Sequence, residues 1–510
     1  MCIRDSINSG IGTHLAIDEG LIFPGGTLVS TDSHANIVGA VGAFGQGMGD
    51  LDIAHAFARG KVWFKVPPTI KVTLTGRPPQ TTAPKDLALF LLKHFGASGL
   101  LGSACEIYGQ AAEALDLSGR ITVASLATEM GGIIILFPPD EAIIERFRAS
   151  AGGDFTPVFA DPGAAYLRED ELDVSGLEPL ISRPGHPDDV VPVAGVKGQK
   201  IDSAFIGSCT NGRYEDLARV AEILQGREVA PGVVLKIVPA TDAIWRRCLE
   251  EGLLAVFKKA GALVGNAGCA GCAAGQIGQN GPGEVTVSTG NRNFPGKQGR
   301  GEVWLASPAT TAASAVAGHL TTEDDIPERP SRFHVRRSRP KRKTAAETGD
   351  RPTQVKGRVW VVDRDNIDTD MIYHNRHLAV TNIEDMGQYA FGNLEGWEDF
   401  SARVAPGDIV VTGSNFGCGS SRQHAVDCFR ALGVAAVIAR SFGAIYERNA
   451  INSGLPIMTA DLGPLDLRDG DELEVDFITG QVCKTGADGA VAGIPFSQVQ
   501  LSIYKRGSLL

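Results

Sequence analysis

The 510-residue chain lacks the long hydrophobic runs of a membrane protein. Its longest apolar stretches, such as Ile133–Phe137, are far shorter than the ~20 residues that cross a bilayer. The N-terminus carries no basic segment followed by an apolar core, the pattern of a secretory signal peptide. Positive charge is also in deficit, because 48 Lys and Arg stand against 59 Asp and Glu, a net charge of −11. These absences disfavour a membrane or a nucleic acid as the main partner.

Cysteine is scarce as well. The nine cysteines are too few and too unevenly spaced for a disulfide scaffold, and two of them form a C-x-x-C pair. This usage favours a reducing compartment, the cytoplasm, with thiols available to a metal. Glycine, by contrast, is abundant at 63 residues, but it follows no fixed period, which excludes collagen and low-complexity sequence.

Short β-branched runs alternate with amphipathic helical stretches, the pattern of an α/β protein. We expect a largely helical, glycine-interrupted stretch at Val38–Arg59. The Gly-, Pro- and Asp-rich residues Asp161–Val191 are typical of a connection between domains. The expected strands are Thr27–Ser30, Thr69–Leu74, Ile121–Ser125, Ile133–Leu136, Glu284–Thr289 and Asp408–Thr412.

A charged segment separates a large part of the chain from a small one. Three acidic residues at 323–325 are followed by eight Arg and Lys between 329 and 343, with prolines interspersed. Because this composition is too charged to bury, we interpret it as a solvated linker, with nucleic-acid binding as the alternative. The opening Met1–Ser6 runs directly into a glycine-rich stretch, so we expect the start of the first domain to be missing. The predicted domains are 1–66, 67–165 and 166–320, then the linker 321–356 and a final domain 357–510.

Three cysteines have a spacing that suits a metal centre. Cys209 follows an expected strand, whereas Cys269 and Cys272 form the C-x-x-C pair among glycines. Three thiolates can hold a cubane iron–sulfur cluster and leave one iron open to substrate. Zinc, a redox dithiol and purely structural cysteines remain alternatives. The other six cysteines are expected to be small buried hydrophobic residues.

Polar groups follow two of the expected strands. In Asp32-Ser33-His34, a carboxylate beside an imidazole can orient it for proton transfer. The simpler alternative is a helix cap with an incidental histidine, and His14 is similarly ambiguous. Arg292 and Lys297 stand on one glycine-containing loop, where two cations suit a dicarboxylate or simply face solvent.

The small part contains a glycine-rich loop, Gly413–His424, between an expected strand and a helix. Free N–H groups at such a helix start favour an anion. Ser420 could lose its proton unusually easily there, with Arg422 adding positive charge. A phosphate-binding loop is the alternative, although the Walker lysine is missing.

Taken together, these motifs resemble the aconitase superfamily, most closely its 3-isopropylmalate dehydratase branch. The resemblance covers nearly the whole chain apart from Met1–Ser6 and the basic linker. Asp365–Asp370 is similar to the opening of the family's small swivelling domain. The other motifs that carry the resemblance are Asp32–His34, Gly207–Arg213, Cys269–Cys272, Asn291–Gly296 and Gly417–Arg422.

The resemblance implies three α/β domains around a 4Fe–4S cluster and a fourth, swivelling β/α domain. Cys209, Cys269 and Cys272 would hold the cluster, with one iron not bound by cysteine. The fourth domain, a separate small subunit in many relatives, would be fused here, so that no separate small subunit is needed.

The implied reaction is the dehydration and rehydration of a small hydroxy-dicarboxylic acid. Ser420 would remove a proton from carbon. The hydroxyl side of the substrate would be lined by Asp32, His34, His14 and Glu129. The other residues implied to bind or orient substrate are Arg292, Lys297, Arg422, Ser421, Ser33, Arg376, Asp370 and Asn291.

Several positions depart from the family pattern. Lys297 and Ser125 stand where relatives usually have Arg and Asn, which puts bidentate carboxylate binding by residue 297 in doubt. A further N-terminal segment of the family, with an Asp–His pair, is missing here, so we expect little or no turnover if Met1 is the real start of the polypeptide. Ala379 and Val380 suit a branched alkyl group, which favours isopropylmalate over homocitrate or citrate. RNA binding by the cluster-free protein is a hypothesis of another class, which the net charge of −11 disfavours.

Overall fold

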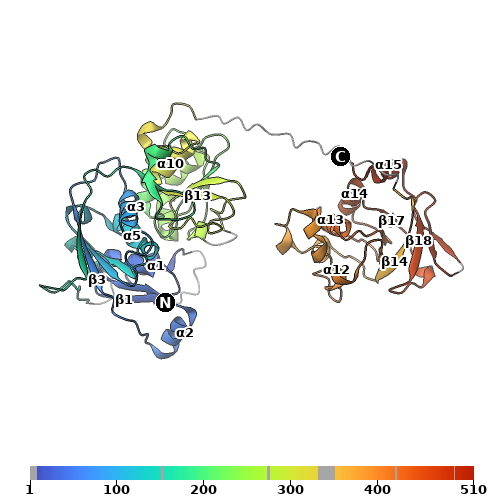
Figure 1. Cartoon of the computed structure of the whole chain (residues 1–510), viewed down its shortest axis with the longest axis horizontal. Helices are drawn as coiled ribbons and strands as arrows, with labels where there is room; N and C mark the ends of the chain where they lie inside the picture. Colours follow the sequence, from blue (N-terminus) through green and yellow to red (C-terminus); the bar gives the residue numbers. More distant parts are fainter. Residues whose placement is uncertain are drawn as a thin grey trace. The chain divides into compact units, whose positions relative to one another are not determined.

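The structure is a computed structural model that describes residues 9–150, 154–272, 276–330, 351–419, 422–487 and 489–509, without the side chain of Cys272. Two compact units make up the chain, Met1–Val335 and Arg336–Leu510, here called the N-terminal and C-terminal units (Figure 1). Most of the predicted linker, residues 331–350, lies outside the described residues.

The first half of the N-terminal unit contains a parallel sheet in the order β5-β4-β3-β6. In β3, buried and half-buried residues alternate, as expected for a strand with one face on the core. The strands are β3 (Thr69–Thr75), β4 (Ala104–Tyr108), β5 (Ile134–Leu136) and β6 (Arg168–Asp173), and the helices are α3 (Pro84–Phe95), α4 (Gln110–Glu113), α5 (Leu117–Ser125) and α6 (Glu141–Ser150).

The strand predicted at Ile121–Ser125 is wrong, because these residues end helix α5. Every residue from Ser118 onward in α5 is buried, and the Asp116 side chain caps its start by accepting a hydrogen bond from the Gly119 N–H group. A short β-branched run that is buried on all sides fits a helix or a strand equally well, so the pattern alone could not decide.

A small parallel pair, β1 (Thr27–Ser30) and β2 (Phe44–Gly47), lies beside this sheet. β2 interrupts the stretch predicted as largely helical at Val38–Arg59, which contains η2 (Ala35–Val41) and α2 (Asp50–Arg59) on either side of it. Gly45 explains the interruption, because a Cβ there would lie 2.1 Å from the Ala35 carbonyl oxygen. Side chains of the predicted domains 1–66 and 67–165 share one hydrophobic cluster.

The second half of the N-terminal unit is built on a seven-stranded sheet in the order β11-β10-β9-β12-β13-β7-β8. Strands β11 to β13 are parallel, whereas β7 and β8 pair antiparallel at the other edge. The strands are β7 (Leu180–Ser182), β8 (Val190–Pro192), β9 (Ser203–Ile206), β10 (Val234–Ile237), β11 (Leu263–Val264), β12 (Val285–Ser288) and β13 (Glu302–Ala306), and the helices are α7 (Tyr214–Leu224), α8 (Asp242–Glu250), α9 (Leu253–Lys259) and α10 (Pro308–Ala317).

The order of this sheet creates a topological switch point between β9 and β12. The chain runs from β9 outward to β10 and β11 and then returns to β12 on the other side of β9. Ligands of open α/β sheets bind at the carboxyl ends of strands at such a point. The stretch predicted as a connection, 161–191, supplies β6 to the first sheet and β7 to the second. Helices α3 and α5 lie between the sheet of β3 and the block that carries α10 and β13 (Figure 1).

The C-terminal unit has a sheet in the order β17-β16-β15-β14-β18-β19-β20, parallel from β14 to β17 and antiparallel from β14 to β20. Two hydrophobic clusters pack within this unit. Its strands are β14 (Gln354–Val362), β15 (Ile409–Thr412), β16 (Ala436–Ala439), β17 (Ile457–Thr459), β18 (Glu472–Asp476), β19 (Gln481–Lys484) and β20 (Ala490–Ala492), and its helices are α11 (Thr369–Ile372), α12 (Phe400–Arg403), α13 (His424–Ala431), α14 (Ala444–Asn452) and α15 (Gln498–Arg506).

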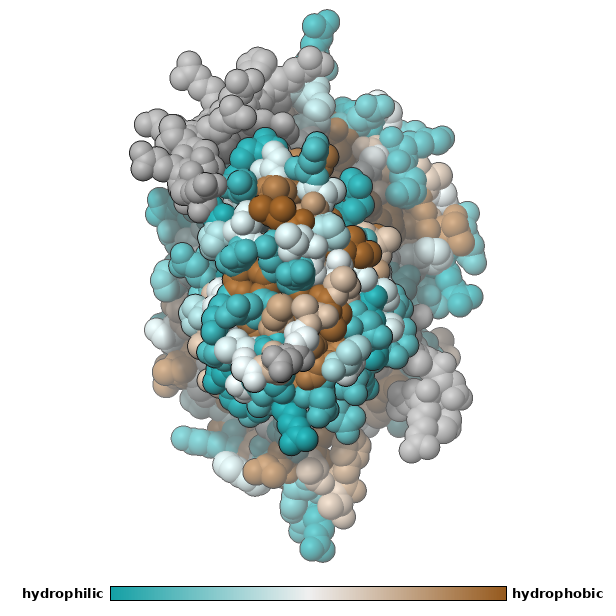
Figure 2. All heavy atoms as spheres, turned by 90° about the vertical axis from the view of Figure 1, so that its right-hand side faces the viewer, coloured by the Kyte–Doolittle hydropathy of each residue, from teal (hydrophilic) through white to brown (hydrophobic). Residues whose placement is uncertain are grey.

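The surface is mixed in character. On the face shown in Figure 2, hydrophilic side chains predominate and hydrophobic ones occur in small groups. None of the helices in the described ranges combines the length and the apolar character needed to cross a bilayer.

Candidate functional site

A cavity of about 120 Å³ in the N-terminal unit brings together most of the polar residues predicted there. It lies at the switch point, because Cys209 follows β9 and Arg292 follows β12, and Asp32 enters from the loop after β1. The predicted residues that line this cavity, here called the cysteine pocket, are Asp32, Ser33, His34, Cys209, Cys269, Asn291, Arg292 and Lys297.

The backbone beside both pocket cysteines is unusual. Ser208, before Cys209, and Ala270, after Cys269, have positive φ angles of 79° and 51°. Such conformations cost free energy for a residue that is not glycine, and they concentrate at functional sites. Both cysteine loops are therefore held in shapes that ordinary turns do not require.

Cys209 is buried, and its Sγ lies 3.9 Å from Asn291 Oδ1 in a hydrogen bond. Cys269 is disulfide-bonded in this structure, so its use as a metal ligand requires reduction. Among the side chains that the structure describes, no group of three His, Cys, Asp or Glu could hold a metal ion, but the side chain of Cys272 is not among them. Once Cys269 is reduced, two thiols in one pocket fit a soft metal centre, an iron–sulfur cluster or zinc.

Glu129 does not line the cysteine pocket, but it holds two side chains that do. It is buried in η3 (Thr128–Met130), where its Oε1 accepts hydrogen bonds from Arg292 Nε (2.7 Å) and His34 Nε2 (3.3 Å). Burial opposes its charge, but His34 and Arg292 outweigh burial and lower the pKa of Glu129. The carboxylate therefore fixes an imidazole and a guanidinium that both face the pocket.

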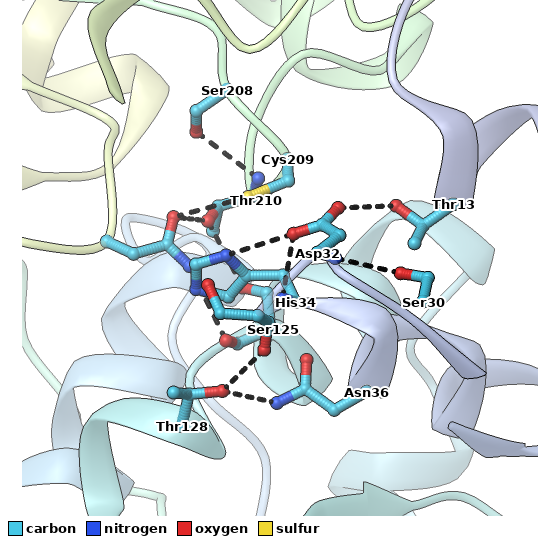
Figure 3. A network of polar contacts seen from close by, with 12 residues as sticks. Thr13, Ser30, Asp32, His34, Asn36, Ser125, Thr128, Ser208, Cys209 and Thr210 are labelled. Carbon is cyan, nitrogen blue, oxygen red and sulfur yellow. Dashed lines mark hydrogen bonds and ion pairs between the residues drawn. The ribbon is translucent and has the colours of Figure 1, made fainter. Parts of the chain in front are cut away.

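His34 is charged in this arrangement. Burial disfavours the imidazolium form, but the side chains of Cys209 and Glu129 raise the pKa of His34 to about 10. Its Nδ1 lies 4.0 Å from Asp32 Oδ1. The polar network around these residues is shown in Figure 3.

Asp32 serves the local backbone as well as the pocket. Its Oδ1 accepts a hydrogen bond from the His34 N–H group (2.9 Å), and its Oδ2 accepts one from Thr13 Oγ1 (3.4 Å; Figure 3). The first contact fixes the turn after β1. Asp32 is not the helix cap of the simpler alternative, because the residue that precedes η2 is His34 and no side chain caps this helix.

His14 lies next to the cysteine loop and is not among the residues that line the pocket. Its Nε2 donates to the Cys209 carbonyl oxygen (2.9 Å), and its Nδ1 accepts from Arg213 (3.4 Å). Burial, followed by the charge of Arg213, lowers the pKa of His14 to about 4. A neutral His14 therefore supports the backbone of Cys209. Sequence reasoning missed Arg213, which also pairs with Asp18 (3.0 Å).

A buried hydroxyl chain links helix α5 to both loops of the switch point. Ser125 Oγ donates to Thr210 Oγ1 (3.2 Å), and Thr210 Oγ1 donates to Asn291 Oδ1. Asn291 Nδ2 in turn donates to the Ser125 carbonyl oxygen (3.4 Å). Sequence reasoning missed Thr210, although it belongs to the quoted motif beside Cys209.

In the C-terminal unit, two predicted motifs pack against each other. The Thr369 N–H group donates to the Cys418 carbonyl oxygen (3.0 Å), and the Gly417 N–H group donates to that of Ile367 (2.8 Å). Gly417 has a φ of 74°, and a Cβ there would lie 2.2 Å from the Tyr446 ring, so only glycine fits.

Arg422 is held by Asp370. Its guanidinium bonds to both carboxylate oxygens, with Nη2 2.7 Å from Oδ2, and Arg422 lowers the pKa of Asp370. Arg376 is exposed and donates through Nε to His377 (2.8 Å). The predicted residues Ser420 and Ser421 lie outside the described residues.

A second cavity, of about 250 Å³, contains none of the predicted site residues. Its wall includes Lys85, Asn211 and Asp216. It is larger than the cysteine pocket, but the residues with paired chemistry line the smaller cavity.

The sequence is similar to known protein families and to individual known proteins. Residues 4–318 match the family model described as aconitase family (aconitate hydratase), and residues 344–461 match that of the aconitase C-terminal domain. The chain is 46% identical over 311 residues to a 3-isopropylmalate dehydratase large subunit of Nitratidesulfovibrio vulgaris, covering 61% of this chain and 74% of the relative. It is 44% identical over 325 residues to a homoaconitase large subunit of Thermus thermophilus, covering 63% and 77%.

A solved structure, 3-isopropylmalate dehydratase (leuD) from Methanocaldococcus jannaschii, is 33% identical, with 31% of this chain and 90% of that chain covered and a TM-score of 0.29. The first family model alone spans more than half of the sequence. The chain therefore belongs to the aconitase family, whose members are hydro-lyases.

Proposed function

We propose that the chain interconverts 2- and 3-isopropylmalate by removing and re-adding water in the cysteine pocket. The observation that carries this proposal is the convergence of Cys209, Asp32, His34 and Arg292 on one cavity, in a chain 46% identical to a 3-isopropylmalate dehydratase large subunit. Removal of a hydroxyl group requires a proton donor, which Asp32 and His34 would supply. Binding of a carboxylate requires a cation, which Arg292 would supply.

The proposed cofactor is a 4Fe–4S cluster held by Cys209, Cys269 and Cys272. The sulfur donors in the pocket and the positive φ angles beside both cysteines support it. When bound, the cluster supplies a Lewis acid at the iron without a cysteine ligand, which makes hydroxide a better leaving group.

Arg292 is the proposed carboxylate-binding group. Its Nε is engaged by Glu129 at 2.7 Å, and its Nη2 lies 3.4 Å from Ser33 Oγ. With one edge of the guanidinium fixed, the remaining N–H groups are oriented for a carboxylate. Lys297 and Asn291 border the same cavity and would complete the polar lining.

Asp32 and His34 are the proposed proton carriers for the substrate hydroxyl. At 4.0 Å, His34 Nδ1 and Asp32 Oδ1 form an ion pair that is too long for a direct hydrogen bond, so each group would exchange a proton with that hydroxyl itself. Glu129 orients His34 through Nε2. We assign His14 to a supporting role at the Cys209 backbone.

The proposal keeps Ser420 as the base that removes the proton from carbon, and Ser421 and Arg376 as substrate-binding residues. Arg422 would bind a carboxylate, oriented by Asp370, as their paired contacts support. Residues 351–509 would supply the function of a separate small subunit. The apolar Ala379 and Val380 favour a branched alkyl substrate over homocitrate, which the similarity to a homoaconitase makes the second candidate.

The test compares hydroxy acids on anaerobically reconstituted protein. We expect 2-isopropylmalate to be preferred over homocitrate and citrate, and Arg292→Ala to lower kcat/KM about 100-fold. Arg300→Ala, an exposed arginine shortly after the same loop, should leave kcat/KM unchanged. A clear preference for homocitrate or citrate would contradict the substrate assignment.

A further inference from the structure

Lys85 is a buried cation outside the residues discussed so far as catalytic. It stands in the first turn of α3 with no exposed surface. Burial lowers its pKa to about 8. The positive end of the helix dipole also disfavours a cation at this position. An ammonium group here needs strong compensation from its neighbours.

That compensation comes from the loop after β12. Lys85 Nζ donates to the carbonyl oxygens of Gly290 (2.9 Å) and Thr289 (3.3 Å), more than 200 positions away in the sequence. Within the described part of the chain, Lys85 forms no ion pair with a carboxylate. Its neighbour Asp86 bonds instead to the N–H groups of Ala83 and Leu180.

The two carbonyl groups belong to the peptide planes just before Gly290 and Asn291, the residues that lead into Arg292. Because a peptide unit is planar, fixing the Gly290 carbonyl also fixes the Asn291 nitrogen and the direction of its Cα. The Gly290 N–H group, in the other plane, donates to Ser288 Oγ (3.0 Å). Gly290 has no side chain that could restrain this turn by packing.

We propose that Lys85 is a positioning residue of the cysteine pocket, which holds the backbone that presents Asn291 and Arg292. The proposal rests on the proposed function only for the role of Arg292 toward a carboxylate. Through Lys85, helix α3 of one half of the N-terminal unit sets the geometry of a loop in the other half.

The test replaces Lys85 by Met, which keeps the length of the side chain and removes its charge and donors. With two carbonyl groups left without their partner, we expect KM for 2-isopropylmalate to rise about tenfold or more, with a smaller change in kcat. Lys93→Met, an exposed lysine of the same helix, serves as the matched control and should keep the wild-type KM.

Hydrogen–deuterium exchange provides a readout that does not depend on turnover. In Lys85→Met, the peptide that covers residues 289–298 should exchange at least threefold faster, whereas β12 and the rest of α3 should exchange at the wild-type rate. If Lys85→Met does not fold, Lys85→Gln, which is shorter and uncharged but retains an amide NH2 group as donor, takes its place in both measurements.

Wild-type KM together with wild-type exchange in 289–298 would overturn the proposal. So would faster exchange spread evenly over α3, β12 and the loop, since that result indicates general destabilisation. A reconstituted wild-type protein that does not bind 2-isopropylmalate would refute the proposed function, while the exchange experiment would still decide the role of Lys85.

Discussion

At the scale of single residues, the cysteine pocket depends on one buried carboxylate. Glu129 binds both His34 and Arg292. One side chain therefore positions both the proposed proton carrier and the proposed carboxylate-binding group. Charge-assisted hydrogen bonds of this kind are about twice as strong as neutral ones. Removing the charge while keeping the shape should therefore weaken both partners at once.

Glu129→Gln tests this dependence. We expect kcat/KM to fall about 100-fold, because the amide cannot neutralise the two cations and can accept only weaker hydrogen bonds. The measurement is steady-state kinetics alongside Glu113→Gln, an exposed residue of α4, as control. A Glu129→Gln protein with kcat/KM within threefold of wild type would refute the organising role of the carboxylate.

The sequence was sufficient to predict which residues of the cysteine pocket have functional side chains. Cys209, Asp32 and Arg292 stand in short motifs directly after strands, and the sheet order then brings strand ends together. Thr210 and Lys85 were not predictable, because ordinary residue types acquire their roles through contacts with Asn291 and Gly290 that are distant in sequence.

At the scale of elements, the N-terminal unit is joined across its two halves by buried polar groups at the start of α3. Asp86 accepts hydrogen bonds from the Ala83 N–H group, at the cap of α3, and from the Leu180 N–H group in β7, both at 2.8 Å. Its burial raises the pKa of the carboxyl group to about 7. The folded protein therefore holds this proton over a pH range in which the unfolded chain has released it.

This shift predicts a pH-dependent stability. Between the ordinary pKa of 3.8 and about 7, the unfolding free energy should fall as pH rises, by about 1.4 kcal/mol per pH unit for one proton, and should level off above pH 7. In Asp86→Asn the part of this pH dependence that arises from the Asp86 proton disappears, because an amide does not titrate. Urea unfolding at pH 5 and pH 8 should show the Asn variant less stable than wild type at pH 5, with the gap narrower at pH 8.

Parallel stability curves for the two proteins would contradict the raised pKa of Asp86. Glu113→Gln is again a suitable control, because an exposed side chain should not change the pH dependence.

The elements also show where sequence patterns stop being informative. The strands predicted at Thr27–Ser30 and Thr69–Leu74 are confirmed as β1 and β3, because short β-branched runs beside turn residues are a clear strand signal. Helix α5 was missed because a buried β-branched run carries no period. The strand β2 was missed because Gly45 is required by a close approach to the Ala35 carbonyl oxygen, which no local sequence pattern reveals.

At the scale of the whole molecule, two family models match the two compact units in order along one chain. The N-terminal unit contains the cysteine pocket, and the C-terminal unit contains the Asp370–Arg422 pair. We propose that the pocket holds an iron–sulfur cluster whose open iron binds a hydroxy-dicarboxylate.

Electron paramagnetic resonance of the anaerobically reconstituted and reduced chain, with and without 2-isopropylmalate, tests this claim without requiring turnover. We expect a cluster signal that shifts when 2-isopropylmalate is added and that is lost in Cys209→Ala. Protein that binds zinc instead of iron, or a cluster signal that no hydroxy-dicarboxylic acid changes, would contradict it.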